Sequence, residues 1–255
     1  MQPIYYIDFD AQACHVEVFV NGFPAVRSNS KFYSNHAAAI NHYLVGHNNI
    51  VRIVAVPTEI DAASAVQAGA MKQVKLHGAI KQYKPGEISC PEGGEVLAKF
   101  NYDQKPGGEF HFDNQVHDFS HLLLHNEKIK DAGFIKDYAL TLFKFSSDDN
   151  MEALSHEFLP KMNDYSTAYF LDQHTTFHQF RTFLVDEFFK YPPEKQHLLR
   201  EEIYVKPYCD DRIFEVGLLP DDPLLARFSE EDHGDKEYQM SIYVALVDGK
   251  LKVVR

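Results

Sequence analysis

The dipeptide Asn21-Gly22 constrains the fold of the N-terminal half more than any other feature of the sequence. Residues 14–20, which precede it, alternate between apolar and other side chains with a period of two, as half-buried strands do. Asn and Gly both tolerate a positive φ, and a type I′ turn requires this at its two central positions. The sequence therefore predicts an antiparallel β-hairpin that turns at residues 21 and 22.

Turn clusters rich in Gly and Pro recur along the next hundred residues, at 84–86, 91–94, 105–108 and 131–133. Between them lie runs that favour strands, at 51–56, 74–81, 95–102, 109–119 and 134–145. Short strands separated by such turns are typical of a sandwich or barrel. We expect residues 1–147 to form an antiparallel β-sandwich, and the fold as a whole to be β-rich with two domains.

The pattern changes after the polar stretch at residues 146–150. Apolar residues at helical spacing predict one helix from about residue 151 and a second over 175–190. The second helix carries an apolar stripe made of Phe177, Phe180, Phe183, Leu184 and Phe188. Period-two alternation returns from residue 201, and Asp248-Gly249 predicts a terminal hairpin. Residues 148–255 are thus expected to form an α+β domain, with two helices packed on a curved antiparallel sheet.

Two resemblances follow from these patterns. The Asn21-Gly22 hairpin, followed by the turn Leu44-Val45-Gly46-His47-Asn48 and an apolar strand, resembles the jelly-roll sandwich of galactose-binding-like domains. Those domains commonly carry an L-x-x-G-x-N turn, and the turn here is one residue shorter. The resemblance covers about the first 145 residues and implies a sandwich that binds carbohydrate, acts as a protein adaptor or serves as a spacer. The element order of residues 148–255 is similar to nuclear-transport-factor-2-like and cystatin-like folds.

Charge and cysteine content narrow the classes of partner and compartment. The net charge is −12 and there is no Lys/Arg run, which disfavours nucleic acid and anionic membranes as ligands and suits a basic protein partner. The three cysteines are widely spaced and suggest neither a disulfide framework nor a redox motif. The sequence shows no signal peptide and no run of about 18 apolar residues, so we expect a cytoplasmic protein.

Histidine is abundant, with 14 residues, and the densest group holds His117, His121 and His125. If this segment is helical, the three imidazoles align at i, i+4 and i+8 and can bind zinc or another divalent ion. The alternative is a loop with solvent-facing histidines. No other cofactor is indicated.

A second candidate site is a polar group at a strand-turn-strand joint. It consists of Tyr204, Tyr208, Asp210 and Arg212, and His178 on the preceding helix is added as a ligand-binding residue. On the concave face of a cone-shaped sheet, these side chains would line a ligand cavity. The alternative is a tight turn at Asp210 that is braced by Arg212.

No GxSxG, P-loop or GxGxxG motif is present, which disfavours the common motif-bearing enzymes. We therefore expect a non-enzymatic binding or interaction protein, with the sandwich as its recognition module. One alternative is carbohydrate binding by the sandwich through exposed Tyr33, Tyr43 and Tyr83. Another is a small-molecule carrier or enzyme with a cavity lined by the Phe stripe, Tyr204, Tyr208 and His178. The sequence leaves the oligomeric state open.

Overall fold

The chain is β-rich, with a large antiparallel sheet and a few helices, in agreement with the expected fold class at this level. The computed structural model describes residues 3–57, 75–84, 86–87, 90, 93–101, 108–114, 116–219, 222–229 and 236–255. Two compact units are formed by Met1–Leu123 and Leu124–Arg255. None of the helices in the described ranges is long and apolar enough to cross a membrane.

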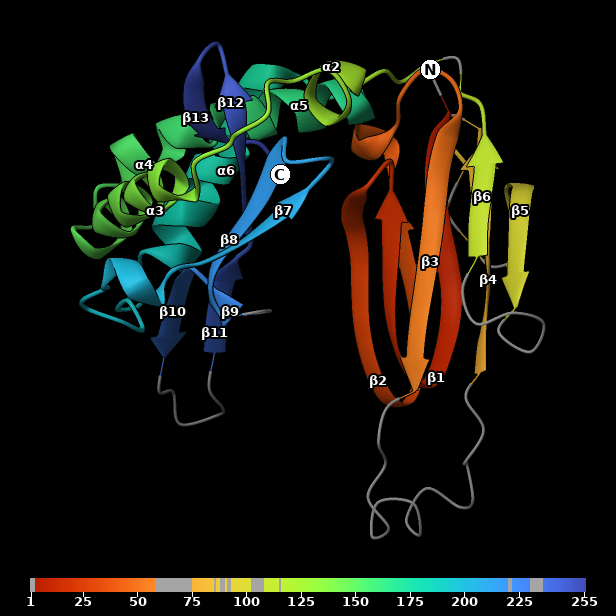
Figure 1. Cartoon of the computed structure of the whole chain (residues 1–255), viewed down its shortest axis with the longest axis horizontal. Coiled ribbons are helices and arrows are strands. Elements are labelled where there is room, and N and C mark those ends of the chain that lie inside the picture. Colours follow the sequence, from red (N-terminus) through yellow and green to blue (C-terminus); the bar gives the residue numbers. More distant parts are fainter. Residues whose placement is uncertain are drawn as a thin grey trace, which may run out of the picture. The chain divides into compact units, whose positions relative to one another are not determined.

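The first unit is built on one six-stranded antiparallel sheet in the order β5-β4-β1-β3-β6, with β2 also paired to β1 (Figure 1). Its strands are β1 (Ile4–Val20), β2 (Phe23–Ala39), β3 (Asn49–Pro57), β4 (Lys75–Tyr83), β5 (Glu95–Asn101) and β6 (Gly108–Phe112). A 3₁₀ turn, η1 (Asn41–Tyr43), follows β2, and a short helix, α2 (Ser120–Leu123), ends the unit.

Strand β1 is the shared element of this sheet. Its first part, residues 4–12, pairs with β4, and its second part, residues 14–20, pairs with β3, while β2 runs along both. The register shifts between Gln12 and Cys14, where Ala13 adopts a φ of 54°. Core side chains come from both parts of β1, and Phe100 of β5 meets Phe110 of β6 with ring centroids 5.9 Å apart. This arrangement is consistent with a β-sandwich.

The predicted hairpin at Asn21-Gly22 is confirmed, because φ is 51° and 83° at these residues and Val20 pairs with Phe23. Asn21 is also buried, and its amide donates to the Tyr43 carbonyl at 2.8 Å and to Asn49 Oδ1 at 3.0 Å. Asn49 in turn bonds both backbone groups of Val45 at 2.7 Å. Buried asparagines thus satisfy the backbone of the loop at this end of the sheet.

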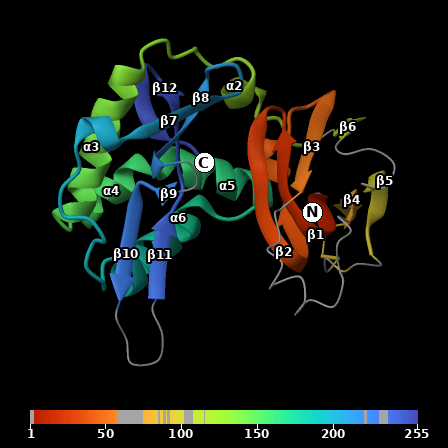
Figure 2. The same ribbon diagram turned by 60° about the horizontal axis from the view of Figure 1, so that its bottom comes forward.

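The second unit begins with helices and ends with strands, as its sequence predicts. The helices are α3 (Ala132–Ser147), α4 (Met151–Glu157), α5 (Leu159–Tyr169), α6 (Gln173–Phe183), the π-helical η2 (Leu184–Phe188) and the 3₁₀ turn η3 (Arg200–Glu202). The strands are β7 (Tyr204–Tyr208), β8 (Ile213–Leu219), β9 (Asp222–Pro223), β10 (Leu225–Ser229), β11 (Lys236–Met240), β12 (Ile242–Val247) and β13 (Lys250–Val253). Helix and strand side chains share one core, and Figure 2 shows α3 to α6 grouped beside these strands.

The strand predicted over residues 134–145 is wrong, because these residues lie in helix α3. Ile135, Ala139 and Leu142 recur at helical spacing and are buried in the core of the second unit. Asp131 caps the helix by accepting a hydrogen bond from the Gly133 amide at 2.8 Å. The domain boundary predicted between residues 147 and 148 therefore falls at the end of α3, inside the second unit.

Three smaller differences concern element lengths. The predicted strand over 109–119 ends at Phe112, and the period-two segment expected from residue 201 is interrupted at Ser241, between β11 and β12. Helix α5 was not predicted; Pro160 lies in its first turn, where proline costs no hydrogen bond. The terminal hairpin at Asp248-Gly249 is confirmed, since φ is 51° and 72° and Val247 pairs with Lys250.

The Arg227 side chain on β10 contacts several other segments of the second unit. It is almost fully buried and donates to the carbonyls of Tyr191, at 2.6 Å, and Ser146. It also pairs with Asp149 at 2.8 Å, and its guanidinium lies 4.4 Å from the ring centroid of Phe189. Arginine suits this position because its planar fork serves several acceptors while its flat face stacks on a ring.

Replacing Gly78 on β4 tests the close packing of the sheet. A Cβ at this position would lie 2.3 Å from the Asp8 carbonyl oxygen and 2.6 Å from Phe9 Cβ. We expect Gly78→Ala to lower the free energy of unfolding by about 1–3 kcal/mol in urea denaturation, because the backbone has to shift. At Gly46 a Cβ meets nothing closer than 3.6 Å, so Gly46→Ala should change stability by less than about 0.5 kcal/mol. Equal effects of the two variants would contradict this packing.

Replacing Arg227 tests whether its buried hydrogen bonds stabilise the second unit. Arg227→Met keeps apolar bulk but leaves two buried carbonyls without their donor, so we expect a loss of about 3 kcal/mol in thermal or urea unfolding. Arg181→Met removes the exposed pair with Glu152, and the expected loss is below about 1 kcal/mol. A loss for Arg227→Met as small as that for Arg181→Met would show that these hydrogen bonds contribute little to stability.

Candidate functional site

Strands β2, β1, β4 and β5 carry a group of polar side chains on their outer face, opposite the core of the first unit. Residues paired across antiparallel strands share a face, so the register places their side chains in rows that cross the sheet. The first row is Asn35, Asp10, His77 and Asn101, the second is Ala37, Asp8, Ala79 and Lys99, and the third is Ala39, Tyr6, Lys81 and Val96. Acceptors thus lie along β1, and donors along β4 and β5.

Asp8 and Lys81 form an ion pair in the middle of this face, with 3.0 Å between Oδ2 and Nζ. The Lys81 side chain is only 8 % exposed. Burial acts to lower the pKa of Lys81, but the interactions with Asp8 and, after them, Tyr83 together outweigh it, and the net pKa is raised. Lys81 therefore stays an ammonium, and its charge is held by one oxygen of Asp8.

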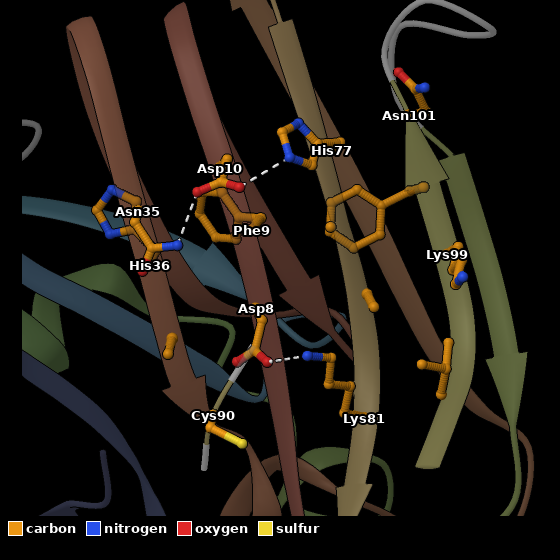
Figure 3. Close-up of a pocket in the computed structure, with 15 residues that line it drawn as sticks. Asp8, Phe9, Asp10, Asn35, His36, His77, Lys81, Cys90, Lys99 and Asn101 are labelled. Carbon is orange, nitrogen blue, oxygen red and sulfur yellow. Dashed lines mark hydrogen bonds and ion pairs between the residues drawn. The ribbon is translucent and has the colours of Figure 1, made fainter. Parts of the chain in front are cut away.

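Asp10 is held by two neighbours. His77 Nε2 lies 2.8 Å from Asp10 Oδ2, and Asn35 Nδ2 donates to Asp10 Oδ1 at 2.8 Å (Figure 3). The carboxylate fixes the imidazole ring while leaving the His77 side chain 61 % exposed. Its second ring nitrogen stays available to a ligand that enters from the open side of the sheet.

A pocket of about 750 Å³ lies over these rows. Two alanines, Ala37 and Ala79, flank Asp8 in its row and leave room for a ligand because they lack bulk. Cys90 lines one end, and behind it the Tyr83 hydroxyl donates to the Cys90 carbonyl at 2.8 Å, with Asp8 Oδ2 3.3 Å away from the same hydroxyl. Volumes of this size are typical of small-molecule sites.

The second carboxylate oxygen of Asp8, Oδ1, is buried and has no hydrogen-bond partner among the residues that the structure describes. Buried carboxylate oxygens are normally hydrogen-bonded, because an unsatisfied one costs about 1–3 kcal/mol. Oδ1 belongs to a residue that lines the pocket. Oδ1 itself has almost no exposed surface, so a ligand donor reaches it only after a small movement of the Asp8 side chain.

The three histidines predicted to bind metal do not lie on one helix, because only Ser120–Leu123 is helical in this segment. His117 is buried, and its Nε2 lies 3.1 Å from the Pro3 carbonyl, whereas His121 and His125 are exposed. The described residues contain no group of three or more His, Cys, Asp or Glu side chains that could hold a metal ion. The helical premise of the metal prediction is therefore wrong.

The polar group around Asp210 is partly assembled, and it braces a turn. Arg212 Nη1 bonds Asp210 Oδ2 at 2.9 Å and the Cys209 carbonyl at 3.1 Å. Lys128, followed by Arg212, lowers the pKa of Asp210. Tyr208 is buried and its hydroxyl donates to Glu215 at 3.0 Å, while Tyr204 lies at the other end of β7.

His178 is an exposed residue of α6, and four members of the phenylalanine stripe beside it, Phe180, Phe183, Leu184 and Phe188, belong to or pack against the core of the second unit. Leu184 and Phe188 have no exposed surface. A shallower pocket of about 410 Å³ lies between α3 and the turn of β12 and β13. In this pocket the Glu157 carboxylate already accepts hydrogen bonds from Tyr138 at 2.6 Å and from Lys252 at 3.0 Å. These three side chains therefore satisfy one another within the protein.

Two of the three tyrosines expected to form an exposed sugar-binding edge pack inside the protein. Tyr83 is buried, and Tyr43 is half-buried and stacked on Phe23 with centroids 4.8 Å apart. The side chain of Tyr33 lies outside the described residues. A carbohydrate bound by this unit would therefore depend on the polar rows of the outer face.

Sequence reasoning missed the pocket residues. Residues 4–10 place Asp8 and Asp10 on one face of a strand by simple alternation, a signal present in the sequence. Their partners His77 and Lys81 follow only from the register between β1 and β4. No protein-family model, curated protein or solved structure matches this chain. Function is therefore inferred from the geometry of its own residues.

Burial of His117 predicts a pH dependence of stability. Burial lowers the pKa of His117 in the folded protein, and the hydrogen bond to Pro3 only partly offsets this effect. The unfolded chain, whose histidine pKa is about 6.5, therefore binds a proton more readily than the folded protein does. Stability should fall as pH drops from 6.5 and level off below the folded pKa. Between pH 8 and pH 5, the melting temperature of His117→Gln should fall less than that of the wild type. The melting temperature of the exposed control His121→Gln should fall as much as that of the wild type. Identical profiles for His117→Gln and the wild type would contradict this.

Proposed function

We propose that this is a non-enzymatic binding protein whose first unit is a recognition module, and that the module binds a hydroxylated ligand of the carbohydrate class. The polar rows around Asp8 carry this proposal, because Asp8 lines the pocket and its Oδ1 is an acceptor without a donor among the described residues. The volume of about 750 Å³ suits a ligand of one or two sugar rings.

The side chains around the pocket match hydroxyl groups. A hydroxyl both donates and accepts, and Asp10, Asn35, His77 and Asn101 offer carboxylate, amide and imidazole groups for both directions. These side chains are already oriented by cross-strand hydrogen bonds, so little ordering is needed when a ligand binds. The resemblance of the N-terminal half to galactose-binding-like jelly rolls favours the same ligand class.

A glycan array tests this function, with Ala79→Leu as the blocking variant. Leucine at position 79 fills the hollow between Asp8 and Lys99, so we expect at least tenfold weaker binding while the melting temperature changes by only a few degrees. Lys84→Leu adds the same side chain at an exposed position that does not line the pocket, and its binding should equal the wild type. Failure of the wild type to bind any glycan would refute the proposal.

Thiol labelling locates the ligand independently. Cys90 lines the pocket and is exposed, whereas Cys14 and Cys209 are buried, so a thiol reagent should label the native protein at Cys90. Saturating amounts of a glycan from the array should slow this reaction at least fivefold. Binding that leaves the labelling rate unchanged would place the ligand outside the pocket.

A further inference from the structure

Not every charged side chain that lines the pocket forms an ion pair within the described part of the chain. Asp8 pairs with Lys81, and Asp10 is held by His77 and Asn35. Lys99 on β5 also lines the pocket, but it forms no ion pair within the described part of the chain. Its neighbours on the same face in β4 and β5 are Ala79, Val96 and Asn101, with His77 and Lys81 diagonal to it, and none of these is acidic.

We propose that the ligand is acidic, a hydroxylated molecule with a carboxylate such as a uronic acid, and that Lys99 binds the carboxylate; this rests on the function proposed above. Lys99 and Asp8 share one row, separated by Ala79. Neighbouring strands lie about 4.8 Å apart, so the two backbones are about 10 Å apart. One sugar ring with an exocyclic carboxylate can bridge this span, with a hydroxyl at Asp8 and the carboxylate at Lys99.

The donors near Lys99 support the same orientation. His77 pairs with Asn101 across β4 and β5, and Asn101 lies on the same face as Lys99, two residues away. The Asn101 amide can donate to a carboxylate, and a hydrogen bond to a charged group contributes about 1.5–3 kcal/mol. His77 uses its Nε2–H on Asp10, so in the neutral imidazole the other ring nitrogen is left to accept from a ligand hydroxyl. The β1 side of the pocket offers Asp8 and Asp10, which would repel a carboxylate. The acidic group is therefore directed toward β5.

The charge of the whole chain opposes an anionic ligand, since it totals −12. At physiological ionic strength, however, exposed charges act mainly within a Debye length of about 8 Å. The ammonium of Lys99 acts at contact distance, whereas most of the acidic residues act from farther away. Local attraction thus outweighs the distant repulsion, and added salt should weaken binding because the contact is exposed.

Calorimetric titration with matched sugars tests this inference. The probes are galacturonate against galactose and glucuronate against glucose, at 50 and 500 mM NaCl. We expect at least one uronate to bind at least tenfold more tightly than its neutral partner at 50 mM NaCl, and this preference to shrink at 500 mM. Lys99→Gln should reduce the preference to less than twofold. Lys84→Gln, which removes an exposed lysine that does not line the pocket, should leave it unchanged.

The outcomes separate the two proposals. Equal affinity for neutral and acidic sugars, or an unchanged preference in Lys99→Gln, would overturn the acidic ligand and leave carbohydrate binding standing. Binding of neither class would overturn both. Lys99 is an exposed residue of an edge strand, so its variant should fold, and an unchanged circular dichroism melt would verify this.

Discussion

The pairing of β1 with three other strands is the constraint on which the first unit depends. Because β1 has partners on both edges, its alternate side chains are committed to two faces: Ile7 and Phe9 to the core, Asp8 and Asp10 to the outer face. A slip of one residue would bury both carboxylates and expose the core. The same register that stabilises the sheet thus sets out the polar rows that form the pocket.

Buried polar groups serve two purposes in this chain. Asn49 and Arg227 donate to the carbonyls of loops and helix ends, and these contacts stabilise the fold. Asp8 differs from them, because one of its oxygens holds Lys81 while the other is buried without a donor among the described residues. An unsatisfied buried acceptor destabilises the folded protein, and a ligand that binds the folded protein can offset this free-energy cost. This contrast separates the candidate site from the structural polar contacts.

Local signals were predictable from sequence, and long-range ones were not. Asn21-Gly22 and Asp248-Gly249 specify their turns through positive φ, so both hairpins were predicted correctly. The many apolar and aromatic side chains of residues 134–145 suit a strand as well as a helix, and only packing against the core of the second unit decides for a helix. The pocket depends on register between strands about 70 residues apart, which alternation cannot supply.

The central claim is that the outer face of β2, β1, β4 and β5 binds the ligand. Nuclear magnetic resonance spectra of labelled protein, titrated with galacturonate and galactose, test it most directly. The account predicts that one or both sugars shift the backbone resonances of Asn35, Asp10 and Asn101 and the imidazole signals of His77. Shifts confined to the second unit, or no shifts with either sugar, would contradict it.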